Sequence, residues 1–361
     1  MSWQLAYAVL SGLLVLLNSV PLYWQFVQGN SGPIAMGVWV VLTNVIEFVN
    51  AVLWYHDDVD RAPVWCDIRV KLAIGQEVGR VAAVFCIARF LADIVSPRAT
   101  AITRKDRRRR AIQDYLLSFG VPGVIMACHV LYQPNRYRLV RGRGCQVTQV
   151  MTWPTLILRI VWSPLFAVGG TLYSAYTVYR LIRHRRNFGR VVAGAHSALT
   201  TARFIRLGAV SMAYLCVGVP LSVWSAIVNI QSSGRYYDYS WTYTHSAWKV
   251  HPVTYGDEPA HDFTSWANVI VGLIFFAAFG FGTEAITAYK RICSVLRLQP
   301  SHQSDSSRAR NWMRQLRAGR WAESSHENRR PPHLAPAFTI GQDVGVKHGV
   351  KVVIEEEQDI V

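Results

Sequence analysis

The fold class is clearest from residues 5–27, which read LAYAVLSGLLVLLNSVPLYWQFV. This stretch is mostly apolar and contains no charged side chain. A helix of about 20 mostly apolar residues crosses the roughly 30 Å hydrocarbon core of a bilayer. Residues 1–4 carry no positive charge, and the apolar run is too long for a cleaved signal peptide. We therefore expect the segment to be a membrane-spanning helix that stays in the protein.

The composition of the whole chain also favours a membrane protein. Of its 361 residues, 17% are charged and 51% are hydrophobic, and the mean hydropathy is +0.17. Soluble chains contain roughly 25% charged residues. The chain has 38 Lys and Arg against 22 Asp and Glu, which gives a net charge of +16. This excess indicates nucleic acid or a membrane, and the position of the basic residues decides between the two.

Six further segments are long and apolar enough to be spans, although the third is unusually polar. The predicted spans cover about residues 5–27, 34–54, 65–95, 112–132, 153–182, 204–230 and 265–289. The predicted fold class is an all-α membrane protein, a seven-transmembrane helix bundle within residues 1–295. Residues 296–361 are rich in Ser, Arg, Pro and His, and we expect them to form a mostly disordered cytoplasmic tail.

Basic residues predict the orientation, because Lys and Arg collect in cytoplasmic loops. They crowd residues 98–110 and the segment from the fifth span into the sixth, whereas acids dominate the loop after the second span. We therefore expect the N-terminus outside, the C-terminus in the cytoplasm, and no nucleic-acid partner. Four arginines disagree with this rule by falling in a predicted outer loop: Arg136, Arg138, Arg141 and Arg143.

Charged side chains at bilayer depth are hypotheses for function by default. Glu77 and Arg80 lie three residues apart on one helix face, where they can pair, and Lys71 lies one turn from Asp67. Two interpretations stay open: a polar ligand cavity or switch, and interhelical pairs that fix the bundle. The charged candidates for the pocket or switch are Glu47, Lys71, Glu77, Arg80 and Arg159.

Prolines interrupt three predicted spans, at Pro122, Pro164 and Pro220. Proline removes a backbone hydrogen bond and kinks a helix. Pro220, with Trp224 one turn further on, is a candidate pivot in the sixth span, and these two residues join the candidate pocket or switch. The alternative is a static kink.

Two cysteines fall on the predicted outer side, Cys66 at the start of the third span and Cys145 in the loop after the fourth. An oxidising compartment permits a disulfide between them. The alternative is two free thiols, because sequence alone does not prove a pairing.

The sequence offers no support for an enzyme, a metal site or a cofactor. It contains no P-loop, HExxH or G-x-S-x-G motif. His245, His251 and His261 cluster in one outer loop, but their spacing matches no zinc pattern, and we expect solvent-facing side chains.

Several short segments, taken together in their order along the chain, resemble one protein family. They are PLYW at residues 21–24, WCDI at 65–68, CIAR at 86–89, GC at 144–145, RFIRL at 203–207 and FGFGTEA at 279–285. Over about residues 5–295 the chain resembles the fungal mating-pheromone receptors of the a-factor type. These are the lipopeptide branch of the class D G-protein-coupled receptors.

The resemblance implies a multi-pass plasma-membrane receptor that binds a prenylated peptide pheromone and activates a heterotrimeric G protein in the mating response. It implies no enzymatic reaction, and a homo-oligomer in the lipid bilayer is compatible with it. The Arg-rich outer loop departs from the acids expected there in the family, so we expect residues 136–143 to mark ligand preference. Two alternatives are a seven-helix receptor for another ligand and a polytopic membrane transporter.

Basic residues at the predicted cytoplasmic ends could contact a G protein, or serve only topology and lipid contact. The candidates for G-protein contact are Arg89, Arg183, Arg185, Arg186, Arg203 and Arg206, of which Arg89 is also a candidate for an inactive-state lock. Tail phosphorylation could drive desensitisation, and an unmodified linker is the alternative. The candidate phosphorylation sites are Ser301, Ser304, Ser306 and Ser307.

Overall fold

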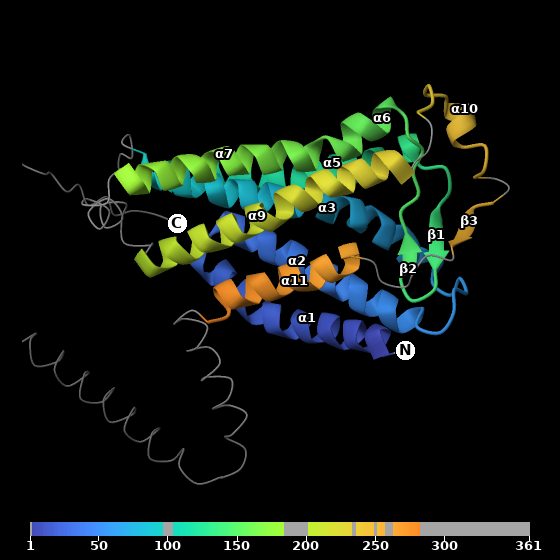
Figure 1. Cartoon of the computed structure of the whole chain (residues 1–361), viewed down its shortest axis with the longest axis horizontal. Helices are drawn as coiled ribbons and strands as arrows, with labels where there is room; N and C mark the ends of the chain where they lie inside the picture. The colour runs from blue at the N-terminus through green and yellow to red at the C-terminus, as the bar shows by residue number, and fades with distance from the viewer. Residues whose placement is uncertain are drawn as a thin grey trace, which may run out of the picture. The chain divides into compact units, whose positions relative to one another are not determined.

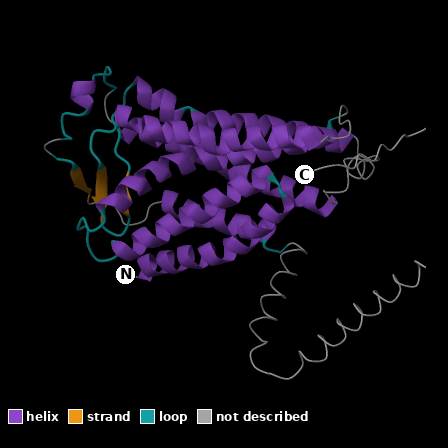
Figure 2. Ribbon diagram, turned by 180° about the vertical axis from the view of Figure 1, so that it is seen from behind, coloured by secondary structure: helices purple, strands orange, loops and turns teal. Residues whose placement is uncertain are grey.

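Each of the seven predicted spans overlaps a helical segment in the computed structural model. The structure describes residues 2–96, 104–183, 201–232, 236–248, 251–256 and 263–281, all of which belong to one unit, Met1–Leu296. Long helices run alongside one another in this unit, and a small sheet lies at one end of them (Figures 1 and 2).

The first three helices follow the predicted spans closely. They are α1 (Ser2–Gln28), α2 (Ser31–Leu53) and α3 (Pro63–Val95). The fourth segment joins α4 (Arg104–Tyr115), the π-helical turn η1 (Leu116–Gly120), α5 (Val121–Ala127) and the 3₁₀ turn η2 (Cys128–Tyr132). The basic residues from Arg104 onward therefore lie on a helix, although the sequence analysis assigns them to a loop.

The later segments differ more from the prediction. The fifth joins α6 (Trp153–Thr155), the π-helical turn η3 (Leu156–Ile160) and α7 (Trp162–Arg183). The sixth is α9 (Thr201–Ser232), and the short α10 (Trp241–Thr244) follows it. The last described helix, α11 (Phe263–Phe279), ends before the predicted boundary at residue 289, and residues 282–289 lie outside the described part of the chain.

Within the part of the chain that the structure describes, four helical segments are long and apolar enough to cross a membrane: Trp3–Gln28, Ser31–Leu53, Lys105–Tyr132 and Trp153–Arg183. The third helix is long enough, but charged side chains interrupt its apolar surface. Residues are buried on all sides of α3, because it lies in the middle of the bundle and packs against α2, α5, α7 and α9. A helix surrounded by protein can carry charges that a lipid-facing helix cannot.

A hydrogen bond from α2 to the π-helical turn η1 accommodates Pro122 in the bundle. Proline cannot donate to the carbonyl four residues earlier, which here belongs to Ser118. The indole Nε1 of Trp39 on α2 donates to this Ser118 carbonyl at 2.9 Å. In lipid, such a carbonyl must find a partner inside the protein. Trp39 therefore supplies the missing bond and fastens α2 to the irregular turn.

Trp39 also lies directly against the backbone of α3. A Cβ atom at Gly79 would come within 2.3 Å of the Trp39 ring, and one at Gly75 would come within 3.1 Å. The ring fits only because these two positions have no side chain. The glycines of α3 and the indole of α2 thus hold the two helices in close contact.

The predicted all-α class omits a small sheet. Strand β1 (Tyr137–Val140) pairs antiparallel with β2 (Gly144–Gln146) and parallel with β3 (Val253–Gly256). Gly142 and Gly144 adopt positive φ angles of 79° and 70° in the hairpin, a conformation that favours glycine. Strands this short, one of them distant in sequence, leave little trace in a hydrophobic pattern.

A disulfide joins the sheet to the bundle. Cys66 at the start of α3 is bonded to Cys145 in β2, with 5.3 Å between the two Cα atoms. Both cysteines are fully buried beside Trp54 and Tyr137. The two cysteines are 79 residues apart in the sequence, and the bridge fixes the hairpin at the N-terminal end of α3.

We predict that Trp39→Phe lowers the free energy of unfolding by about 1–3 kcal/mol, because it leaves the buried Ser118 carbonyl without a donor. The measurement is the thermal unfolding of the purified full chain in detergent. Trp3→Phe is the matched control, since Trp3 is 74% exposed. Equal unfolding temperatures for the two variants would contradict the assigned bond.

Candidate functional site

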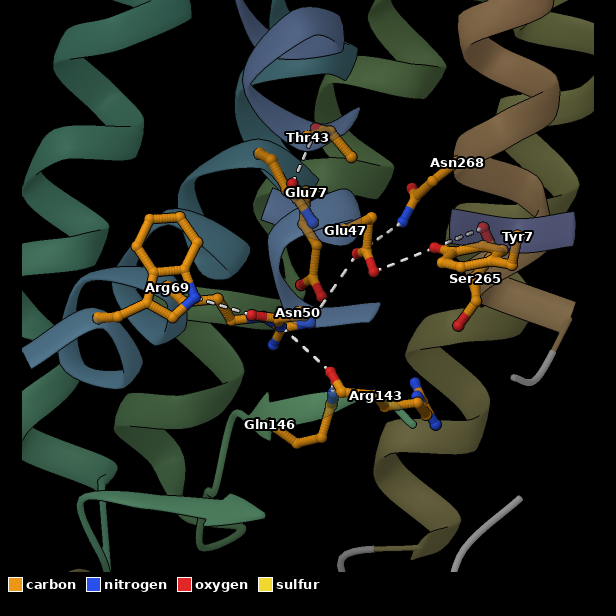
Figure 3. Close-up of polar contacts among 12 residues, drawn as sticks. Tyr7, Thr43, Glu47, Asn50, Arg69, Glu77, Arg143, Gln146, Ser265 and Asn268 are labelled. Atoms are coloured by element: carbon orange, nitrogen blue, oxygen red, sulfur yellow. Dashed lines mark hydrogen bonds and ion pairs between the residues drawn. The ribbon is translucent and has the colours of Figure 1, made fainter. Parts of the chain in front are cut away.

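The carboxylate of Glu47, on α2, is the centre of a buried polar network (Figure 3). The hydroxyl of Tyr7 on α1 donates to it at 3.0 Å, and the amide of Asn268 on α11 donates at 3.3 Å. The guanidinium of Arg69 on α3 lies 3.9 Å away. One buried side chain therefore links the first three helices to α11, which is far from them in the sequence.

Arg80 extends this network from α3. Its Nη1 donates to the side-chain Oδ1 of Asn268 at 2.8 Å, and its Nε donates to the backbone carbonyl of Gln76 at 3.2 Å. The hydroxyl of Thr43 donates to the side-chain oxygen of Gln76 at 2.8 Å. Hydrogen bonds thus run from Glu47 through Asn268 and Arg80 back to α2.

The predicted pair between Glu77 and Arg80 is wrong. Glu77 instead accepts from Arg159 in η3 at 3.2 Å, and the Ser163 hydroxyl donates to the Glu77 backbone carbonyl at 3.1 Å. Residues three apart differ in direction by about 60° around a helix axis. In the middle of a bundle this difference is enough for Glu77 to face α7 while Arg80 faces α11.

Lys71 has a different partner from the nearest acid in sequence. Its ammonium lies 3.0 Å from Nδ1 of His129 and donates to the Gln133 side chain at 3.1 Å. An ammonium can only donate, so Nδ1 accepts, and Nε2 of His129 donates to the Thr148 carbonyl at 3.3 Å. Asp67 is bound by Arg136 instead, at 2.5 Å.

Several polar atoms near the network remain unsatisfied. The side chains of Ser11 and Asn18 on α1 and the Nε of Arg69 are buried without a hydrogen-bond partner among the described residues. A Cβ atom on Gly272 of α11 would lie 3.4 Å from Asn18, so this face of α1 meets α11. Unmet buried donors and acceptors are costly, and they offer bonds to a polar group entering between these helices.

The sheet at the end of the bundle is bonded to α2 at Asn50, three residues after Glu47. Asn50 on α2 accepts from the Trp65 indole at 2.8 Å and donates to the Arg143 carbonyl at 3.1 Å (Figure 3). The Tyr137 hydroxyl donates to Asp60 at 2.8 Å. Burial is the larger cause, and this hydrogen bond the smaller one, that raises the pKa of Tyr137 above that of a free tyrosine. Tyr137 therefore remains a donor at physiological pH.

The predicted selectivity arginines have unequal environments. Arg136 is paired with Asp67, and Arg138 lies against the position where Gly256 has no side chain. The backbone carbonyl of Arg143 accepts from Asn50 on α2, and Arg141 is exposed at the hairpin turn. Neutralising all four would therefore alter the packing of the sheet as well as its charge.

At the opposite end of α3, Arg89 is held by an acid that the sequence analysis does not single out. Its Nη2 lies 2.8 Å from Asp114 of α4, which is only 2% exposed. The hydroxyl of Ser31 at the start of α2 donates to the same carboxylate. These bonds join α2, α3 and α4 at one end of the bundle.

The remaining predicted residues fall into three groups. Pro220 and Trp224 have exposed side chains on α9, and their role as a pivot stays a prediction. Arg183 donates to the Tyr179 hydroxyl at 2.5 Å, and Arg206 is half-buried. Outside the described residues, or with undescribed side chains, lie Arg185, Arg186, Arg203, His261, Ser301, Ser304, Ser306 and Ser307.

The sequence analysis names Glu47, Lys71, Glu77, Arg80 and Arg159, and the structure gives each a buried or half-buried polar partner. It misses several residues of the site, among them Tyr7, Asn268 and His129. Their signal is weak, because an isolated uncharged polar residue within an apolar span attracts no attention. Among the described residues, no group of three or more His, Cys, Asp or Glu could hold a metal ion.

Comparison with known proteins gives a consistent result. Residues 6–299 match the family described as Pheromone A receptor. The Pheromone B alpha 3 receptor of Schizophyllum commune is 30% identical over 76% of this chain and 45% of its own length. The chain thus spans about half the length of this relative.

Two further relatives come from other fungi. The Pheromone receptor 1 of Mycosarcoma maydis is 28% identical over 79% of this chain and 81% of its own length. The Pheromone a factor receptor of Saccharomyces cerevisiae is 26% identical over 82% of this chain and 63% of its own length. These matches confirm the resemblance drawn from the sequence motifs. The chain belongs to the Pheromone A receptor family.

Proposed function

We propose that the chain is a plasma-membrane receptor that binds a prenylated peptide pheromone and activates a heterotrimeric G protein in the mating response. The observation that carries this proposal is the family match over residues 6–299. The names of the relatives, among them an a factor receptor, support the ligand class.

The proposed receptor crosses the bilayer seven times, with the N-terminus outside. Two features support this orientation. The disulfide between Cys66 and Cys145 belongs in an oxidising compartment, so the sheet faces outward. The basic residues of α4 lie at the other end of α3, near Asp93 and Arg89, and basic residues favour the cytoplasmic side.

In this orientation the Glu47 network lies in the outer half of the bundle, below the sheet. We propose that the peptide part of the ligand meets this network, where Arg69, Ser11 and Asn18 have unmet hydrogen-bonding atoms. The prenyl chain adds about 0.8 kcal/mol of binding for each buried methylene. Loss of that chain is therefore expected to weaken binding strongly.

We further propose that the pair between Arg89 and Asp114 holds the inactive state. A ligand shifts a two-state protein only by binding one state better than the other. Separation of α3 from α4 would free Arg89 for an acidic surface of a G protein. The basic ends of α7 and α9, including Arg183 and Arg206, are proposed to contact the same surface.

The central experiment expresses the full chain in yeast that lacks its own pheromone receptors and carries a G-protein-driven reporter. We expect at least one prenylated peptide in a fungal pheromone panel to activate the reporter. Its unprenylated form should need at least about tenfold more peptide, since two methylenes alone contribute about 1.6 kcal/mol. Silence toward every prenylated peptide, despite surface expression, would count against the proposal.

The same panel tests the proposed selectivity loop. Arg141→Gln should change the rank order of the peptides, because Arg141 is exposed at the hairpin turn. Arg61→Gln is the matched control, an exposed arginine on the same side that pairs with Asp57. An identical rank order for Arg141→Gln and the unmodified receptor would remove Arg141 from ligand selection.

For the proposed lock, we predict that Asp114→Asn raises the ligand-independent reporter signal several-fold, because it removes the charge that holds Arg89. Asp93→Asn is the matched control. It breaks the neighbouring pair with Arg110, at 2.7 Å, whose acid is 46% exposed. A basal signal that is the same in both variants at equal surface level would show that the Arg89 pair is only structural.

A further inference from the structure

One face of the fifth helical segment carries a stripe of exposed aliphatic side chains. They recur three or four residues apart, which places them on the same side of the helix, and each is 50 to 67% exposed. The stripe consists of Ile157, Val161, Leu165, Val168 and Leu172. Because the segment Trp153–Arg183 is long and apolar enough to cross a membrane, this stripe suits contact with lipid hydrocarbon.

Exposed aromatic residues continue the stripe at both of its ends. Trp153 lies one turn before Ile157, and Tyr176 lies one turn after Leu172. At 1.5 Å per residue, Trp153 and Tyr176 are about 35 Å apart along the helix axis. This length lies between the hydrocarbon core of a bilayer, about 30 Å, and its full thickness of about 40–45 Å. Trp and Tyr collect at the two membrane interfaces, so Trp153 marks the interface at the end near the sheet.

The segment that connects α9 to β3 packs against this boundary. The ring of Tyr239 meets that of Trp153 edge-on, with 6.0 Å between the ring centroids. Tyr237 donates its backbone N–H to the carbonyl of the residue two positions before Trp153, at 3.1 Å. The ring of Tyr237 in turn lies 5.2 Å from that of Tyr243 in α10. The aromatic side chains of this connection therefore start at the interface that Trp153 marks.

The fourth segment holds α10 at the same end of the bundle (Figures 1 and 2). The Nε2 atom of His245 lies 2.9 Å from the Val130 carbonyl of η2, and its Nδ1 atom lies 2.9 Å from the Trp241 carbonyl. The Trp241 ring packs on the imidazole, with 3.9 Å between the centroids. Val130 is itself exposed, and it lies near the end of the apolar segment Lys105–Tyr132. The ends of two membrane-capable segments thus position the connection.

The composition of the connection indicates what covers it. Residues 236–248 read YYDYSWTYTHSAW, with a single acid and no Lys or Arg. Tyr237, Trp241 and Tyr243 are 39 to 53% exposed. Tyr and Trp combine an apolar ring with a polar O–H or N–H group, which suits the headgroup level of a bilayer. Hydrocarbon would exclude Asp238, which is exposed, so the headgroup level fits this segment better than the bilayer interior.

We propose that residues 236–245 form an aromatic anchor in the headgroup layer of the bilayer on the side of the sheet. The partner is the lipid surface, which also covers the stripe on the fifth segment. One continuous lipid contact then extends from α7 to α10. Since β3 follows the anchor and pairs with β1, the anchor also holds the sheet at the membrane surface. The proposal rests on the proposed function only in requiring that the fourth and fifth segments cross the membrane.

The test places the full chain in phosphatidylcholine nanodiscs that contain one of two photoreactive lipids. One lipid carries a diazirine in its headgroup, and the other carries it at the end of an acyl chain. Mass spectrometry then locates the labelled peptides. We expect the headgroup probe to label residues 236–245, and the acyl-end probe to label residues 161–168 but not residues 236–245. Labelling needs no pheromone or G protein, so its result is independent of whether the receptor signals.

Variants of α10 test whether the aromatic rings hold the anchor in place. Trp241→Ser with Tyr243→Ser should lose the headgroup label on residues 236–245, whereas Trp241→Phe with Tyr243→Phe should retain it. Tyr255→Ser is the matched control, because it removes an exposed tyrosine of β3 and should leave this label unchanged. Acyl-end label on residues 161–168 should persist in all of these variants, which shows that the chain is folded and inserted.

Four results would overturn the proposal. Headgroup label absent from residues 236–245, with acyl-end label present on residues 161–168, would refute the anchor and leave the membrane-crossing receptor intact. Acyl-end label absent from residues 161–168 would refute both. Equal headgroup labelling of the double serine variant and the unmodified chain would show that the rings do not hold the segment. Loss of the headgroup label on addition of a prenylated peptide would assign the aromatic residues to the ligand instead.

Discussion

The Glu47 carboxylate contacts Tyr7 of α1, Arg69 of α3 and Asn268 of α11. The hydrocarbon core of a bilayer contains no water that could replace these partners. In lipid every buried polar group must be satisfied inside the protein. The same constraint explains why Arg159 binds Glu77 and why Lys71 binds His129. The polar side chains of the central helix α3 thus act as fixed connections between helices.

Backbone groups obey the same constraint. Pro122 frees the carbonyl of Ser118, and the Trp39 indole binds it, which ties α2 to an irregular turn. At the end of the bundle that carries the sheet, Asn50 binds the Arg143 carbonyl and the disulfide from Cys66 holds the hairpin. The network, the irregular turn before Pro122 and the sheet are therefore all attached to α2.

The sequence predicts the helices well, because apolar runs of about 20 residues have few alternatives. The predicted order of the spans also places Cys66 and Cys145 on the same side of the membrane. It fails where the partner is far away in the chain: Glu77 faces Arg159 rather than Arg80, and Asp114 holds Arg89. Helical spacing reports which residues share a face, but the neighbouring helix decides the pairing. The short sheet and the exposure of Trp224 depend on the same non-local packing.

The most direct test of this account is the thermal unfolding of the full chain carrying Glu47→Leu, alone and with Arg69→Met. The single change leaves Arg69 buried without its carboxylate, so it should lower the free energy of unfolding by about 3–5 kcal/mol. The double change removes both charges and should recover most of that loss. A single variant as stable as the unmodified chain, or a double variant less stable than the single one, would contradict the claim that paired buried charges hold the bundle together.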